Sequence, residues 1–144
     1  MLFDFRYVFG IPLIASRRYA QTVAAFSVGL TGLPDFQLTP ATSLDRMAPR
    51  LGFKAIRIER HPEFNKHYCL RGDEDFQIGA LFTNQLIDRL ASLDRRAEYS
   101  IEKGGDWLIV YRHGVLARPA SIADFWNFAE QLAELFVPQQ SARF

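Results

Sequence analysis

The first residues of the chain alternate between aromatic and polar side chains. Every second position carries a ring: Phe3, Phe5, Tyr7 and Phe9. Asp4 and Arg6 lie between the rings, and this period of two residues is that of a β-strand. A second β-favouring run from residue 19 to residue 28 predicts another strand, and residues 31–35 are typical of a loop.

A helical signal follows the loop. Thr39 followed by Pro40 is typical of a helix start, because Thr caps the first turn and Pro suits the first helical position. Apolar side chains then recur at helical spacing: Leu44, Met47, Ala48 and Leu51. Pro49 lies inside this pattern, so we expect the helix to be short or kinked.

Strand and helix signals then alternate. Residues 54–60 and 66–71 show the polar–apolar alternation of strands. Asp73 is placed to cap a helix, and the acidic side chains after it suit the positive end of the helix dipole. The inner face of this helix carries apolar residues on both sides of a predicted break near Thr83: Ile78, Leu81, Phe82, Leu86, Ile87, Leu90 and Leu93.

Residues 97–112 predict a β-hairpin with Gly104-Gly105 as its turn, because glycine readily adopts the positive φ that tight hairpin turns require. In this register Tyr99 faces Val110, and Ile101 faces Leu108, which gives one apolar side for packing. The other side mixes carboxylates with large side chains, which is unusual for a purely solvated surface. It supplies our candidate binding residues: Glu98, Glu102, Trp107, Ile109 and Tyr111.

A last helix begins at Ser121, with Asp124 three residues later as a variant of the capping box. Its apolar stripe is wide: Ile122, Phe125, Trp126, Ala129, Leu132, Ala133 and Phe136. The coarse order is strand-strand-helix three times over. It predicts a single α+β domain over residues 1–144, with helices packed on a largely antiparallel sheet of about six strands.

Composition adds one unusual feature, the number of aromatic rings. The 144 residues include 13 Phe, 5 Tyr and 2 Trp, and a small domain cannot expose so many rings without consequence. Two covered sheet faces, a homodimer contact or a ligand groove would each account for them.

The net charge of +1 supplies no field to attract nucleic acid, so we expect no nucleic-acid partner. A single Cys excludes an intrachain disulfide.

Metal-capable side chains gather in the middle of the chain: His61, Glu63, His67 and Cys69. They match no standard zinc spacing. If 66–71 is a strand, His67 and Cys69 share one face, which brings only two ligands together. A nucleophilic Cys69 beside His67 lacks any sign of an oxyanion hole. With Asp73, these residues are the candidate polar cluster of a small metal-dependent or Cys/His hydrolase, but we predict no catalytic residue, metal or cofactor.

Three segments together carry a family resemblance. They are L-P-D-F-Q-L-T-P from Leu33, I-R-I-E-R-H-P-E-F-N-K-H-Y-C-L-R-G-D-E from Ile56, and W-L-I-V-Y-R from Trp107. The chain from about Tyr19 onward resembles a family of uncharacterised bacterial proteins, in which a soluble domain often follows one or two predicted membrane helices. The resemblance implies no activity. It implies a cytoplasmic domain at the inner face of a membrane.

The function that we expect is that of a non-enzymatic interaction or self-association domain. A small hydrolase and a binder of small apolar ligands are the alternatives. Asp4 and Arg6 interrupt the apolar start, so no secretory signal is visible. No apolar run approaches about 18 residues, so we expect no membrane span in this chain. A homo-oligomer or a protein partner is the expected form of contact.

Overall fold

Seven antiparallel strands form one sheet in the order β1-β2-β7-β6-β3-β5-β4. Their bounds are β1 Leu2–Ile11, β2 Ala15–Ser27, β3 Phe36–Pro40, β4 Lys54–Ile56, β5 Tyr68–Gly72, β6 Tyr99–Gly104 and β7 Trp107–Arg112. The computed structural model describes residues 1–11, 15–27, 32–41, 54–93 and 98–136. The predicted α+β class with an antiparallel sheet is confirmed, with seven strands among the described residues where about six were expected.

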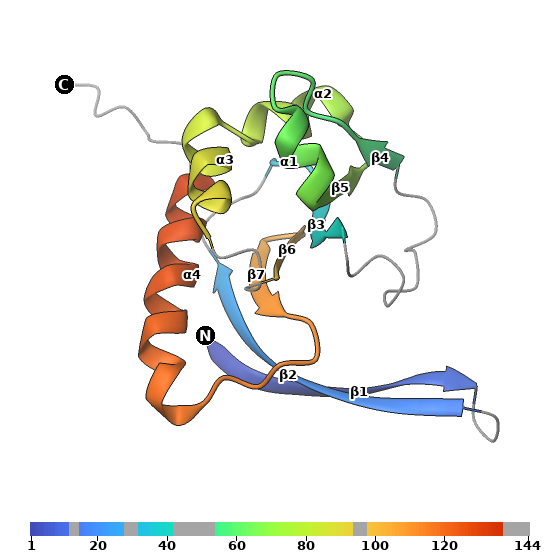
Figure 1. The fold of residues 1–144 in the computed structure, drawn as a ribbon, viewed down its shortest axis with the longest axis vertical. Helices are drawn as coiled ribbons and strands as arrows, with labels where there is room; N and C mark the ends of the chain where they lie inside the picture. Colours follow the sequence, from blue (N-terminus) through green and yellow to red (C-terminus); the bar gives the residue numbers. More distant parts are fainter. Residues whose placement is uncertain (12–14, 28–31, 42–53, 94–97, 137–144) are drawn as a thin grey trace.

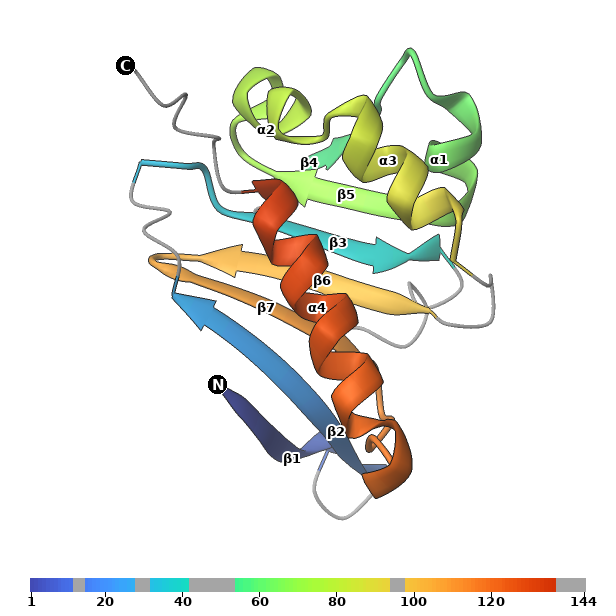
Figure 2. The same ribbon diagram turned by 90° about the vertical axis from the view of Figure 1, so that its left-hand side faces the viewer.

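The helices cover one face of this sheet. They are α1 Pro62–His67, α2 Asp75–Leu81, α3 Asn84–Ala91 and α4 Ile122–Phe136, the last preceded by the short 3₁₀ helix η2 Pro119–Ser121. Figure 2 shows α4 lying across the middle strands with α3 beside it. The predicted apolar stripe of α4 accounts for this position, because its buried members face the sheet: Phe125, Ala129, Leu132, Ala133 and Phe136.

The core lies between the helices and the centre of the sheet. Leu38 of β3 is paired with Ile101 of β6 on one side and with Leu70 of β5 on the other. All three side chains are fully buried. The ring of Phe36 stacks on that of Phe136 at 5.3 Å between centroids, which fixes the end of α4 against β3.

Several expected elements are confirmed. The alternating N-terminal rings lie in β1, and the second run lies in β2. The helical segment after residue 73 is divided where we expected a break. Thr83 caps α3, and its side-chain oxygen accepts a hydrogen bond from the Leu86 backbone N–H at 3.3 Å.

The predicted helix start at Thr39-Pro40 is wrong. Both residues are buried in β3, where Thr39 is paired with Cys69 and Pro40 with Tyr68 of β5. Pro40 is tolerated because it is the last residue of its strand and lies beyond the part of β3 that pairs with β6. The remainder of the predicted helix, residues 42–51, lies outside the described residues.

Two predictions around β4 and β5 need correction. Residues 66–71 are not one strand, because α1 ends at His67 and β5 begins at Tyr68. Pro62 begins α1, and the Asn65 side chain holds the helix to the preceding segment through the backbone of Ile58. The strand predicted at 54–60 is limited to Lys54–Ile56.

Asp73 does not cap the following helix. The N-cap residue of α2 is Glu74, and it makes no capping hydrogen bond through its side chain. The acidic residue in the first turn of α2 is Asp75, which still suits the positive end of the helix dipole.

The hairpin of β6 and β7 exists, but its register differs by two residues from the prediction. Ile101 pairs with Val110 and Gly104 with Trp107, so the two-residue loop is Gly105-Asp106. Gly105 takes the positive φ, +55°, at the first loop position. A shift of two residues keeps every side chain on its predicted face, since faces alternate with period two.

Candidate functional site

The candidate binding residues of the hairpin do not form one open surface. Tyr111 and Glu102 lie side by side on the helix-free face, and they are only 3% and 8% exposed. The Tyr111 hydroxyl donates to Glu102 Oε1 at 2.6 Å, and Gln37 Nε2 donates to the same oxygen at 3.1 Å. Burial, together with the charge of Glu102, raises the pKa of Tyr111 far above its ordinary value. These residues form a buried network.

The other members of that set lie apart from the network. Trp107 is 45% exposed at the end of the hairpin, and Ile109 is half-buried between it and Tyr111. Glu98 precedes β6 with a positive φ of 47°. It lines a hollow beside His67 at the C-terminal end of α1. Binding through these residues stays a prediction.

A row of rings ties the first two strands to the body of the domain. Tyr7 of β1 stacks on Phe5 at 5.6 Å and on Tyr19 of β2 at 5.3 Å. Its hydroxyl lies 3.0 Å from His113 Nδ1, just beyond β7. Burial, Tyr19 and Glu102 together raise the pKa of Tyr7. His113 lies in the turn after β7 and is half-buried against these rings.

The candidate polar cluster is divided between three places. His61, Glu63 and His67 line a shallow hollow of about 220 Å³ beside α1. Cys69 lies on β5, where its Sγ accepts a hydrogen bond from Arg71 Nε at 3.4 Å.

Asp73 lines a different hollow, with Asp35 and Glu74. Within the described ranges, no three His, Cys, Asp or Glu side chains are placed to hold a metal ion. The structure therefore brings together the two histidines and Glu63 of the predicted cluster, and it leaves Cys69 and Asp73 apart from them.

The outer edge of β1 was not singled out in the sequence. Met1 and Ala25 exchange two backbone hydrogen bonds, each 2.7 Å long. In an antiparallel pair the bonded positions alternate, so the even residues Leu2, Asp4 and Arg6 direct their backbone N–H and C=O groups away from β2. No other described strand pairs with this edge.

Exposed rings accompany that open edge. Phe3 and Phe5 are 38% and 49% exposed, on the sheet face opposite the helices. Figure 1 shows the hairpin of β1 and β2 reaching well beyond the helices. The side chains of Asp4 and Arg6 are exposed on the opposite face of the same strand.

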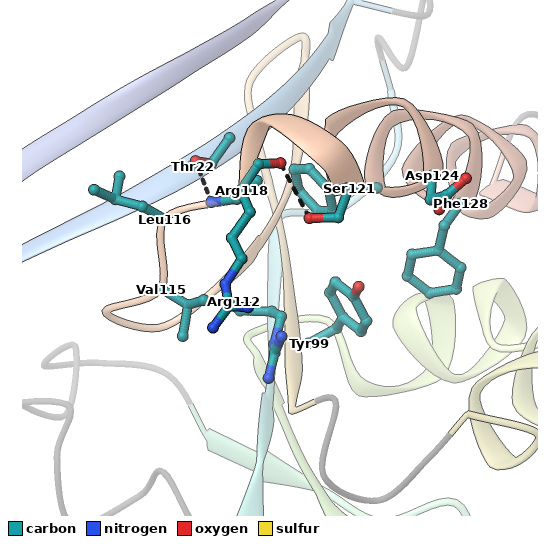
Figure 3. Close-up of a pocket in the computed structure, with 11 residues that line it drawn as sticks. Thr22, Tyr99, Arg112, Val115, Leu116, Arg118, Ser121, Asp124 and Phe128 are labelled. Atoms are coloured by element: carbon teal, nitrogen blue, oxygen red, sulfur yellow. Dashed lines mark hydrogen bonds between the residues drawn. The ribbon is translucent and has the colours of Figure 1, made fainter.

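A cavity of about 510 Å³ lies between the first turns of α4, Thr22 of β2, and the ends of β6 and β7. Figure 3 shows it lined by rings on one side and by the side chains of Arg112 and Arg118 on another. Tyr99 stacks on Phe125 with centroids 6.1 Å apart and contacts Phe128 at 4.5 Å. Burial raises the pKa of Tyr99, and the charge of Arg112 opposes that shift.

The loop that closes the cavity is held to β2. The Thr22 backbone N–H donates to the Val115 carbonyl at 3.0 Å, and Thr22 Oγ1 accepts from the Ala117 N–H at 2.8 Å. The same hydroxyl donates to Asp4 Oδ1 at 2.7 Å. Thr22 therefore connects the cavity loop with the edge strand.

Searches against protein families, curated proteins and solved structures find no match to this chain. In the described part of the chain, none of the helices is both long enough and apolar enough to cross a membrane.

Proposed function

We propose that this chain is a non-enzymatic self-association domain, and that two copies join through their β1 strands into one continuous antiparallel sheet. The observation that supports the proposal is the open edge of β1, a ten-residue strand with exposed rings. Natural proteins usually shorten, cover or distort such an edge, because its unpaired backbone groups attract other strands.

The charges on β1 favour one register. If the two-fold axis passes beside Phe5, Asp4 of each copy lies directly opposite Arg6 of the other. Both residues direct their backbone groups outward, so these positions are also the hydrogen-bonded ones. Opposite charges facing each other across two strands contribute roughly 0.2–1 kcal/mol per pair.

Neighbouring registers are penalised by the same two side chains. Sliding the pairing by two residues in one direction puts Asp4 opposite Asp4 of the second copy. The same slide in the other direction puts Arg6 opposite Arg6. Like charges directly opposite each other are destabilising, and a slide by one residue would move the side chains to the wrong face. The charge pattern is therefore self-complementary in one arrangement.

The rings support the same register. With the axis beside Phe5, the two Phe5 side chains face each other at a non-hydrogen-bonded position, where opposed side chains come closest. Phe3 of each copy then faces Tyr7 of the other. Aromatic pairs across strands are favourable, and this pairing would cover the rings that are exposed in the single chain.

The resemblance noted in the sequence adds a setting to this proposal. If the domain lies at the cytoplasmic face of a membrane, two copies held in that membrane meet at a high effective concentration. A weak contact through β1 is then sufficient to join them.

Sedimentation velocity over a range of protein concentrations tests the proposal. We expect the unmodified chain to show a reversible monomer–dimer equilibrium. Asp4→Arg and Arg6→Asp should each weaken dimerisation roughly tenfold, because either change creates like-charge pairs. The double variant that carries both changes should recover the original affinity. Trp107→Ser is the matched control, since it removes an exposed ring on the same face, on a strand that β2 separates from β1.

Two results would count against the proposal. One is a chain that stays monomeric at every concentration. The other is a dimer whose affinity is the same in both single charge variants as in the unmodified chain. Thermal unfolding of each variant separates loss of pairing from loss of folding, because Asp4 also accepts the hydrogen bond from Thr22.

A further inference from the structure

The cavity under the start of α4 combines apolar walls with positive charge. Its volume of about 510 Å³ lies within the range of small-molecule sites, about 300–1,000 Å³. The walls are built from ordered rings, because Tyr99 is held by Phe125 and Phe128. The loop on the other side is pinned to β2 through Thr22. The cavity is therefore formed by elements that hold it open.

The charge of the cavity is unevenly distributed. Arg112 and Arg118 line one side, and Asp124 lines the cavity from the first turn of α4. Arg112 is half-buried, and its guanidinium carbon lies 5.9 Å from the centre of the Tyr99 ring. Figure 3 shows the two arginine side chains extending in the same direction beside Tyr99.

Arg118 is placed differently from its neighbour. Its backbone carbonyl accepts hydrogen bonds from Ser121, which closes the turn of η2. Its side chain is exposed, and among the described residues its guanidinium has no hydrogen-bond or ion-pair partner. A guanidinium group in this position can bind an anion without first breaking an existing bond.

We infer that this cavity binds a small organic anion, with its phosphate or carboxylate between Arg112 and Arg118 and its apolar ring against Tyr99 and Phe128. Guanidinium groups bind both kinds of anion through paired, charge-assisted hydrogen bonds. The aromatic wall provides a stacking surface for the apolar part. Asp124 fixes the orientation, because it disfavours the anionic end on the α4 side. This site is separate from the β1 edge and does not depend on self-association.

Isothermal titration calorimetry with phenyl phosphate tests the inference. Benzoate, inorganic phosphate and benzyl alcohol are the comparison probes. We expect phenyl phosphate or benzoate to bind at least tenfold more tightly than inorganic phosphate, which lacks the ring, and than benzyl alcohol, which lacks the charge. Arg118→Gln should weaken binding about tenfold. Arg57→Gln, which removes an exposed arginine away from the cavity, should leave binding unchanged.

Three results would overturn the inference. The first is no heat of binding with either phenyl phosphate or benzoate. The second is equal binding of benzyl alcohol, which would show that charge plays no part. The third is unchanged affinity in Arg118→Gln. Because Arg118 is exposed and supports the fold only through its backbone, this variant should fold, and its thermal unfolding provides the check.

Discussion

The two edges of the sheet differ in length and in what they expose. At one edge, β4 has three residues, and its buried side chain is Ile56. At the other, β1 has ten residues with exposed rings at Phe3 and Phe5. A very short strand is a common way to prevent pairing at an edge. The β4 edge follows that rule, whereas the β1 edge does not, and we interpret β1 as an edge suited to pairing with another chain.

The largest expected effect separates the centre of the sheet from its β1 edge. Leu38→Ala removes a fully buried side chain from β3 and should lower the free energy of unfolding by about 2–5 kcal/mol. Phe5→Ala should change it by less than about 1 kcal/mol, because half of that side chain is already exposed. Chemical denaturation measures both values. If Phe5→Ala lowered the free energy of unfolding more than Leu38→Ala, the β1 edge would support the fold more than the centre of the sheet, contrary to this expectation.

The next effect concerns the network that lies between the two edges. Tyr111→Phe removes the donor to Glu102 and leaves a buried carboxylate with one fewer hydrogen bond, at a cost of about 1–3 kcal/mol. Tyr99→Phe is the matched control, since no hydrogen bond of the Tyr99 hydroxyl is found among the described residues. Equal unfolding free energies for the two variants would show that the network contributes nothing.

Alkaline pH should destabilise the domain through its buried tyrosines. Burial raises the pKa of four of them above 10.0: Tyr7, Tyr68, Tyr99 and Tyr111. The folded chain holds these protons more tightly than the unfolded chain, so their stabilisation is complete below pH 10 and decreases as the pH rises above it. Tyr111, the most deeply buried of the four, contributes a slope of up to about 1.4 kcal/mol per pH unit. Solvent screening makes the contributions of the half-buried Tyr7, Tyr68 and Tyr99 smaller.

Denaturation at several alkaline pH values measures this slope. In Tyr111→Phe it should be shallower by one such contribution. An unchanged slope in this variant would mean that Tyr111 ionises as freely in the folded chain as in the unfolded one.

The smallest effect is expected at Trp107. It is 45% exposed, so Trp107→Ser, like Phe5→Ala, should alter the free energy of unfolding by less than about 1 kcal/mol. Its sedimentation should match that of the unmodified chain. A loss of dimer in this variant, with β1 intact, would move the contact from the edge strand to the hairpin of β6 and β7.

The sequence predicted those parts of the fold where local pattern and packing agree. The alternation around Asp4 and Arg6 and the stripe of α4 indicated their elements correctly, because one face of each is apolar. The helix start predicted at Thr39-Pro40 is wrong because β3 pairs with β5 and β6, and this pairing overrides the local helix signal. The hairpin register failed because Gly105, rather than Gly104, occupies the first loop position.

The sites were harder to predict than the elements. That β1 lies at an edge depends on strand order, which no local pattern reveals. Tyr99 and Arg118 line one cavity because the pairing of β6 with β7 places Arg112 opposite Tyr99, and Arg118 follows soon after Arg112 in the chain. The sequence signal for pairing through β1 was the opposite charges of Asp4 and Arg6, two positions apart. These charges indicate pairing only when a second copy of the chain is placed beside the first.

The most direct test of self-association through β1 is to mix the two single charge variants, Asp4→Arg and Arg6→Asp, and to measure sedimentation velocity. Each variant alone should be mainly monomeric at a concentration where the unmodified chain dimerises. The mixture should dimerise, because each copy then presents the charges that the other requires. A mixture that sediments as the sum of two monomers would contradict the account.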